Sequence, residues 1–181
     1  MTESLRKESS GAKHLALYLG ISFVVIVIDL WTKAIATSNL EYAIPVQVYR
    51  LWDGLTGFNF TLLHNTGAAF SFLASESGWQ RWFFIALACS VSIGLTVWLT
   101  KLKEDKWVAW AVALILGGAI GNLYDRITLG YVVDFLHFYW GDYHFPAFNI
   151  ADTAISIGAG MMVLDLFRSK PTQTTNKSEN A

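Results

Sequence analysis

The stretch LALYLGISFVVIVIDLW, from Leu15 to Trp31, is almost entirely apolar, and Asp29 near its end is its only charged residue. A helix needs roughly 20 mostly apolar residues to cross the hydrocarbon core of a bilayer. Three further stretches have this character: Trp82 to Thr100, Trp107 to Tyr124 and Ala151 to Phe167. The sequence therefore predicts a mainly α integral membrane protein with four transmembrane helices.

The composition agrees with this class. Of the 181 residues, 54% are hydrophobic and 15% aromatic, and the mean hydropathy of +0.40 exceeds what a soluble domain needs to fill its core. The first stretch also has features of a cleavable signal peptide, namely a basic start and the small residues Ala34 and Ala36. Two features argue against a signal peptide. Asp29 and Lys33 lie where a cleavage region would be uncharged, and the apolar core is longer than the roughly 7 to 15 residues of a typical signal-peptide apolar region.

Lysine and arginine residues are divided unevenly between the two sides of this four-helix topology. Nine of the 13 lie on the side that holds both termini and the middle loop: Arg6, Lys7, Lys13, Lys101, Lys103, Lys106, Arg168, Lys170 and Lys177. The other side holds Lys33, Arg50, Arg81 and Arg126. Cytoplasmic loops carry the excess of basic residues, so both termini are predicted to be cytoplasmic. The net charge of -1 indicates nothing further, and the sequence has no basic patch to support nucleic acid binding, so nucleic acid is not an expected partner.

The outer segment 34–81 is too long for a structureless connection. It contains two β-rich runs, IPVQVYRLW (44–52) and FNFTLL (58–63), separated by the turn signals Asp53-Gly54 and Thr56-Gly57. We expect a small hairpin or sheet on the outer membrane surface, with its aromatic residues at headgroup level.

Three other segments complete the organisation of a single membrane domain. Residues 1–13, on the cytoplasmic side, and the tail 171–181 are polar, and disorder is expected in both. The stretch Phe70 to Trp79 is expected to form a short interfacial segment before the second span. The second outer segment, Ile127 to Ile150, is dense in aromatic residues and is predicted to be a loop.

Polar side chains gather where the apolar stretches end on the outer side. They are Asp29, Lys33, Asn122, Asp125, Arg126, Asn149 and Asp152, and Asp134 is tethered nearby. Each alone has a structural explanation: Asn149 and Asp152 are spaced like a helix N-cap and an acid in the first turn, and Asp29 and Lys33 like an i,i+4 ion pair. Polar groups at membrane depth are costly and usually functional, so their convergence on one face predicts a site.

Some other features are predicted to be structural. Gly117 and Gly121 form a small-xxx-small pattern that favours close helix packing. Asp165 and Arg168 are spaced like an ion pair at the cytoplasmic end. Cys89 is the only cysteine, which excludes a disulfide within the chain.

The residue types at the predicted site favour carboxylate chemistry. The sequence has no HExxH zinc motif and no GxSxG elbow. None of its histidines lies inside a predicted span, where it could hold haem; they are His14, His64, His137 and His144. Two aspartates held close together cannot both ionise, so one keeps a proton, and the pair can activate water for peptide hydrolysis. Spacing alone does not select the two aspartates. No metal or organic cofactor is expected.

Two long blocks then identify a family. GNLYDRITLGYVVDF (121–135), followed by PAFNIADTAISIG (146–158), resembles the signature blocks of the bacterial lipoprotein signal peptidases, also called signal peptidase II. DLWTK (29–33) and HNTGAAFSFL (64–73) match as well. The resemblance extends in order from about Leu15 to Phe167.

The resemblance implies an aspartyl endopeptidase at the outer face of the bacterial cytoplasmic (inner) membrane. Its substrates would be prolipoproteins, cut just before a cysteine modified with diacylglycerol, and membrane lipid would be its other partner. The implied catalytic pair is Asp134 and Asp152. The implied supporting residues are Asp29, Lys33, Asn65, Gly67, Asn122, Asp125, Arg126 and Asn149.

Asp125 is the alternative catalytic residue, although we expect it to orient Arg126 or to hold the loop that carries Asp134. Two other classes of function are weighed against a peptidase. A small proton-coupled transporter would need polar residues along the whole membrane path, whereas here they stop at one face. A non-catalytic scaffold would bind partners through the aromatic outer loops, and replacing Asp134 would then have little effect.

Overall fold

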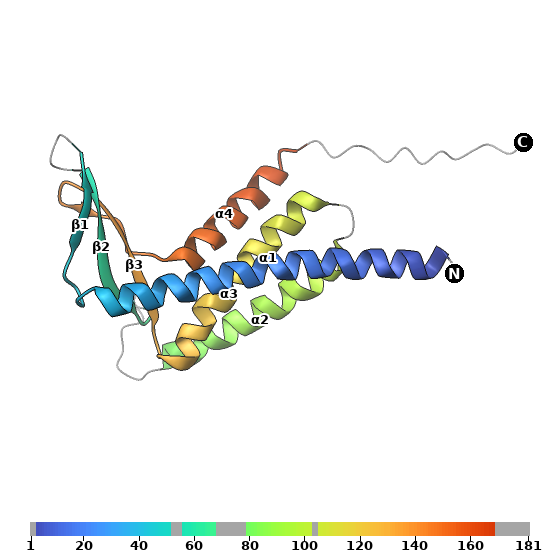
Figure 1. The fold of residues 1–181 in the computed structure, drawn as a ribbon, viewed down its shortest axis with the longest axis horizontal. Coiled ribbons are helices and arrows are strands. Elements are labelled where there is room, and N and C mark those ends of the chain that lie inside the picture. The colour runs from blue at the N-terminus through green and yellow to red at the C-terminus, as the bar shows by residue number, and fades with distance from the viewer. Residues whose placement is uncertain (1–2, 52–55, 68–78, 103–104, 169–181) are drawn as a thin grey trace, which may run out of the picture.

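The computed structural model describes residues 3–51, 56–67, 79–102 and 105–168. Four helices lie alongside one another, and a small antiparallel sheet covers the end at which α1 ends and α4 begins (Figure 1). In chain order the elements are α1 (Glu3–Asn39), β1 (Val46–Arg50), β2 (Thr56–Asn65), α2 (Trp79–Lys101), α3 (Lys106–Thr128), β3 (Val132–Trp140), β4 (Tyr143–His144) and α4 (Ile150–Asp165).

Three of the helices are long and apolar enough to cross a membrane: the Gly11–Asn39 part of α1, α2 and α3. The fourth, α4, has only 16 residues, fewer than the roughly 20 of a typical span. The structure thus bears out a mainly helical membrane protein with a small sheet, while the fourth span stays a prediction.

The ends of the predicted spans differ from the observed helices. The helix α1 begins at Glu3, so the part of segment 1–13 that the structure describes is helical where we expected disorder. Leu5, Arg6 and Lys7 are good helix formers, and they extend a helix that the first apolar stretch has already nucleated. Segment 171–181 and nearly all of Phe70–Trp79 lie outside the described residues.

The helix α3 is the centre of the bundle and packs against α1, α2 and α4. Glycines allow the close approach that the sequence predicted. A Cβ atom on Gly117 would lie 2.7 Å from Cβ of Val25 in α1, and one on Gly121 would lie 2.6 Å from Oδ2 of Asp29. A Cβ atom on Gly118 would collide with the backbone oxygen of Ala151 in α4. At these three positions α3 therefore lies too close to α1 and α4 to carry a side chain of its own.

The sheet has the strand order β1-β2-β3-β4, and all neighbouring strands are antiparallel. The predicted hairpin is present as β1 and β2, but Thr56-Gly57 lies within β2 rather than in a turn, and Asp53-Gly54 lies outside the described residues. The prediction of a loop over Ile127–Ile150 was wrong, because this segment contributes β3 and β4.

The segment Ile127–Ile150 was predicted to be a loop because its main strand, β3, depends on pairing with the distant strand β2. The strand β3 is completed by a partner about seventy residues earlier in the chain, with Leu63 opposite Asp134 and Asn65 opposite Val132. An irregularity in register between Phe60 and Leu63 lies beside Asp134. This pairing brings the Asn65 segment to the same place as Asp134, at the helix ends.

Candidate active site

Asp134 lies on β3 and is almost completely buried, with 3% of its surface exposed. Its Oδ1 accepts a hydrogen bond of 2.7 Å from Nδ2 of Asn149, and the Asn65 side chain is a second hydrogen-bond partner. Because a strand rather than a flexible loop carries Asp134, the position of its carboxylate is fixed by the sheet.

Asp152 lies in the first turn of α4 and is partly exposed. The residue before this helix, Asn149, is its N-cap: the Asn149 side chain accepts from the Asp152 backbone N at 2.9 Å, and the Asp152 carboxylate accepts from the Asn149 backbone N at 3.3 Å. This reciprocal capping box confirms the predicted N-cap. Nδ2 of Asn122 in α3 donates to Oδ1 of Asp152 at 2.7 Å.

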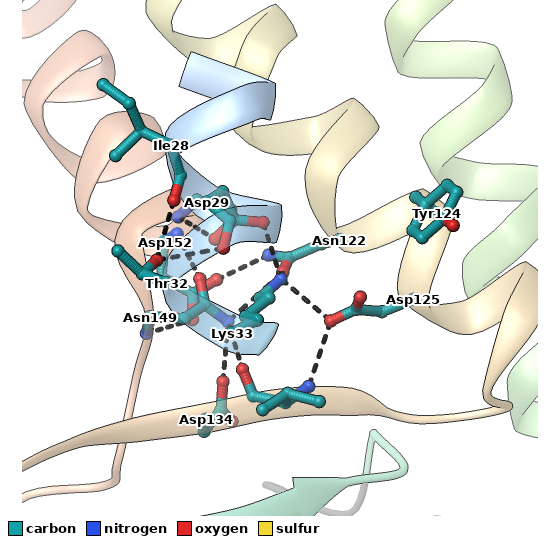
Figure 2. A network of polar contacts seen from close by, with 12 residues as sticks. Ile28, Asp29, Thr32, Lys33, Asn122, Tyr124, Asp125, Asp134, Asn149 and Asp152 are labelled. Atoms are coloured by element: carbon teal, nitrogen blue, oxygen red, sulfur yellow. Dashed lines mark hydrogen bonds and ion pairs between the residues drawn. The ribbon is translucent and has the colours of Figure 1, made fainter. Parts of the chain in front are cut away.

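Two asparagines connect the carboxylates, as Figure 2 shows. Asn149 is completely buried and reaches Asp134 with its side chain and Asp152 with its backbone. Its Nδ2 also donates to Oδ1 of Asn122 at 3.2 Å. Asp134 and Asp152 thus belong to one hydrogen-bonded group, which joins β3, α3 and α4.

A buried cation lies behind this group. Nζ of Lys33 is 2.8 Å from Oδ2 of Asp29, 2.9 Å from Oδ2 of Asp125 and 3.0 Å from Oδ1 of Asn122 (Figure 2). The predicted i,i+4 pair of Asp29 and Lys33 is confirmed, and a second carboxylate joins it. Buried ionic groups keep their charge only when they are paired and hydrogen-bonded, as these are.

Asp29 and Asp125 each also hold a backbone segment that carries one of the two aspartates. Oδ1 of Asp29 accepts from the backbone N of Ala151, next to Asp152, at 2.9 Å. Oδ2 of Asp125 accepts from the backbone N of Val133, next to Asp134, at 3.1 Å. Of the two roles expected for Asp125, the geometry therefore supports holding the Asp134 segment, which is a strand.

The electrostatic surroundings of Asp134 favour its protonated form. Burial, together with the nearby charge of Asp152, raises its pKa from 3.8 to about 7, and hydrogen bonds from Asn65 and Asn149 and the charge of Lys33 act in the opposite direction. A carboxyl group with such a pKa keeps a proton on a substantial fraction of molecules at neutral pH. This is the state that an aspartic pair needs to donate a proton to a substrate.

The remaining predicted site residues lie around this group. Oδ1 of Asn65 accepts from the backbone N of Gly67 at 2.8 Å, and Gly67 has a φ of +96°, where a Cβ atom would collide with the Phe84 ring. The Arg126 guanidinium lies 5.1 Å from the centroid of the Phe84 ring and donates to the backbone O of Asn122 at 3.4 Å. The structure therefore brings all of the predicted site residues to one end of the bundle.

A cavity of about 310 Å³ opens beside Asp134. Sequence reasoning missed part of its lining, including Tyr42, Pro146 and Ala147. His64 also lines it, stacked on Tyr131 at 3.9 Å and with the tilted ring of Tyr42 at 4.8 Å, measured between ring centroids. Of these residues, His64 opens the matching segment 64–73 and Pro146 and Ala147 open the second signature block, whereas Tyr42 lies outside the matching segments. Among the described residues, no group of three or more His, Cys, Asp or Glu side chains could hold a metal ion.

Comparison with known proteins decides the family. The family model for signal peptidase (SPase) II matches residues 21–168. This chain belongs to the signal peptidase II family. The curated lipoprotein signal peptidase of Acinetobacter baumannii (strain ATCC 17978) is 54% identical over 155 residues, covering 85% of each chain. That of Pseudomonas fluorescens is 51% identical over 160 residues, covering 87% of this chain and 91% of the relative.

The fold also resembles a solved bacterial membrane enzyme, determined by the in meso method. The TM-score is 0.69 at 28% identity, and the match covers 92% of this chain and 94% of the other. The signal peptidase II family consists of membrane aspartic peptidases that process lipoproteins, so the sequence-based prediction of a peptidase is confirmed. The transporter and scaffold alternatives have no such support.

Proposed function

We propose that Asp134 and Asp152 form the catalytic pair with which this signal peptidase II removes the signal peptides of prolipoproteins. The observation that supports the pair most directly is that one buried residue, Asn149, hydrogen-bonds to both carboxylates. Its side chain donates to Asp134, and its backbone N donates to Asp152. Asp125 is the less suitable partner, because both Lys33 and the backbone N of Val133 engage its Oδ2.

The unequal surroundings of the two carboxylates suggest their roles. Asp134, whose pKa burial raises to about 7, holds the shared proton and donates it to the carbonyl oxygen of the scissile peptide bond. Asp152, which is more exposed, accepts a proton from the attacking water, whose oxygen bonds to the carbonyl carbon. When the resulting tetrahedral intermediate breaks its C–N bond, Asp152 gives this proton to the leaving amine, and the hydroxyl proton returns to Asp134.

The supporting residues fix this geometry. In our proposal Asp29 holds the start of α4 through Ala151 and Asp125 holds β3 through Val133. Lys33 compensates the charges of these two carboxylates. Asn65 lines the cavity beside Asp134, along which an extended peptide would pass. Gly67 and Arg126 are proposed to support this substrate side.

The substrate is proposed to be a prolipoprotein whose cysteine already carries diacylglycerol, cut on the amino side of that cysteine. The lipid keeps the substrate in the bilayer, so its scissile bond reaches the enzyme at the membrane edge. The position of Asp134 and Asp152 near the ends of the candidate spans α1 and α3 supports this proposal. Membrane lipid is therefore the second expected partner.

The proposed placement is the bacterial inner membrane, with both termini in the cytoplasm and the sheet on the outer surface. In this placement α4 is the fourth span, and the exposed Leu166 and Phe167 extend its apolar length. Exposed aromatic side chains of the sheet, such as Tyr49, Trp140 and Tyr143, are suited to the headgroup region.

Cysteine labelling tests this placement. In a Cys89→Ala background, a membrane-impermeant maleimide should label Tyr143→Cys in intact spheroplasts but Ser10→Cys only after the membrane is permeabilised. Labelling of Ser10→Cys in intact spheroplasts would reverse the proposed topology.

Cleavage by the purified enzyme in lipid tests the proposed substrate. A prolipoprotein carrying the diacylglyceryl cysteine should yield a mature product that begins with the lipidated cysteine, as mass spectrometry would show. The same precursor without the lipid is the matched control and should be cut at least about a hundredfold more slowly, because it lacks the acyl chains that hold the cysteine and its scissile bond in position at the membrane edge. Equal cleavage of both precursors would contradict the substrate assignment.

A further inference from the structure

A pair of histidines lies outside the proposed catalytic group. His137 lies on β3 and His144 on β4, and Nε2 of His137 is 3.1 Å from Nδ1 of His144. His137 follows Asp134 by three residues on the same strand, so its side chain points to the opposite face of the sheet. Nothing in the proposed reaction uses this pair.

The separation of the two nitrogens is close to that of imidazoles sharing one metal ion. With bonds of about 2.0–2.1 Å, two nitrogens on a tetrahedral zinc ion lie about 3.3 Å apart. The pair needs an opening of only a few tenths of an ångström to reach this spacing. The ring centroids are 5.1 Å apart, farther than the 3.1 Å between the two nitrogens, so these nitrogens lie on the facing edges of the rings.

A third residue orients the pair. Oγ1 of Thr61, a buried residue of β2, is 3.1 Å from Nδ1 of His137. When the hydroxyl accepts from this nitrogen, the Nε2 lone pair of His137 points at His144. Metal-binding histidines are commonly fixed by such a contact at the other ring nitrogen. His144 is exposed, so an ion and its water ligands can reach the pair from solvent.

We propose that His137 and His144 form a binding site for one divalent transition-metal ion of the class of Cu²⁺, Ni²⁺ and Zn²⁺. The two imidazole nitrogens supply two ligands, and water fills the remaining positions. On binding, the hydrogen on Nδ1 of His144 is replaced by one on its Nε2, so neither side chain changes charge. Imidazole favours these ions over Mg²⁺ and Ca²⁺, and Cu²⁺ should bind most tightly.

Titration of the untagged full-length protein in detergent with Cu²⁺ tests this site. Calorimetry should give one high-affinity equivalent, and electron paramagnetic resonance should show two nitrogen ligands. His144→Gln should weaken binding at least about tenfold and remove one nitrogen from the spectrum, whereas Thr61→Val should weaken it by about tenfold while keeping both. His64→Gln, which removes a histidine that packs against Tyr131 and Tyr42, is the matched control and should bind like the parent.

Thermal unfolding of each variant in the same detergent checks that the sheet is intact before binding is compared. Excess Mg²⁺ should leave the Cu²⁺ titration unchanged. Unaltered Cu²⁺ binding in both His137→Gln and His144→Gln, or equal loss in His64→Gln, would overturn the assignment. So would the absence of any Cu²⁺ binding by the folded parent.

Discussion

At the residue scale, Asp134 and Asp152 differ in what surrounds them. Asp134 is buried in the sheet and Asp152 is partly exposed at a helix start. Our account needs the proton on Asp134, whose pKa is raised to about 7. As pH rises through this value Asp134 loses the proton that it donates, so kcat/KM should fall on the alkaline side with a midpoint near pH 7.

The pH dependence of kcat/KM for a lipidated prolipoprotein in mixed micelles measures this midpoint. Asp125→Asn is a control, since it removes a nearby carboxylate but leaves Asp134 to titrate. A profile that stays flat from pH 6 to pH 9 would rule out Asp134 as the proton donor.

The same shift predicts how Asp134→Asn changes stability. In the unfolded chain the carboxyl group titrates near its ordinary pKa of 3.8, whereas in the folded protein it titrates near 7. The folded state binds this proton more tightly, so stability falls as pH rises from 3.8 to 7. An asparagine does not ionise, and Asp134→Asn should therefore be more stable than the parent at pH 8, by on the order of 4 kcal/mol, with a smaller gain at pH 5.

Thermal unfolding in detergent at both pH values would show this gain. Asp142→Asn, which removes an exposed carboxylate on the turn between β3 and β4, is the matched control. If the parent were at least as stable as Asp134→Asn at pH 8, ionised Asp134 would not destabilise the folded protein, and its raised pKa would be contradicted.

At the scale of elements, the start of α4 combines capping with the proposed catalysis. Asn149→Ala removes the N-cap, which costs about 1 kcal/mol, and also removes the partner of Asp134. We expect kcat/KM to fall by about a hundredfold, because both carboxylates lose their orientation.

The N-cap of α3 is the matched control for this change. The Asp105 side chain accepts from the backbone N of Val108 at 3.2 Å, at the start of α3. The helix α3 starts at the end of the bundle away from the sheet (Figure 1). Asp105→Ala should cost a similar free energy of unfolding but leave kcat/KM within about twofold. If both variants lost activity equally, the role of Asn149 would be only structural.

The elements also show which features a sequence can predict. The Asn149 cap and the Asp29–Lys33 pair depend on spacings of three and four residues, so local rules were sufficient. The strand β3 depends on pairing with β2, far away in the sequence, and its aromatic residues were therefore taken for a loop. The contacts of Asp125 with Lys33 and Val133 depend on the same tertiary arrangement.

At the scale of the whole molecule, close packing of α3 on α4 positions the site. Gly118→Ala would place a methyl group against the backbone of Ala151, which precedes Asp152. We expect a loss of about 1–3 kcal/mol in unfolding free energy and a lower kcat/KM. Gly94→Ala in α2 has open space around the new methyl group, so it should be neutral or slightly stabilising.

Thermal unfolding and cleavage assays on the two glycine variants separate packing from helix propensity. Equal effects of Gly118→Ala and Gly94→Ala would contradict the close contact between α3 and α4.

The sequence predicted the membrane class, and its polar span ends predicted that α1, α3 and α4 share a site. It could not show how the site is connected. The two asparagines that join Asp134 to Asp152 act across three elements, and no spacing in the chain indicates which amide meets which carboxylate. The family resemblance, rather than periodicity, selected this pair among the aspartates.

The most direct test of the account compares three variants in one cleavage assay on a diacylglyceryl-modified prolipoprotein: Asp134→Asn, Asp152→Asn and Asp125→Asn, each shown to be folded. We predict no detectable cleavage by the first two, and reduced but measurable cleavage by Asp125→Asn. Continued turnover by Asp134→Asn or Asp152→Asn, with loss of activity in Asp125→Asn, would contradict the proposed catalytic pair.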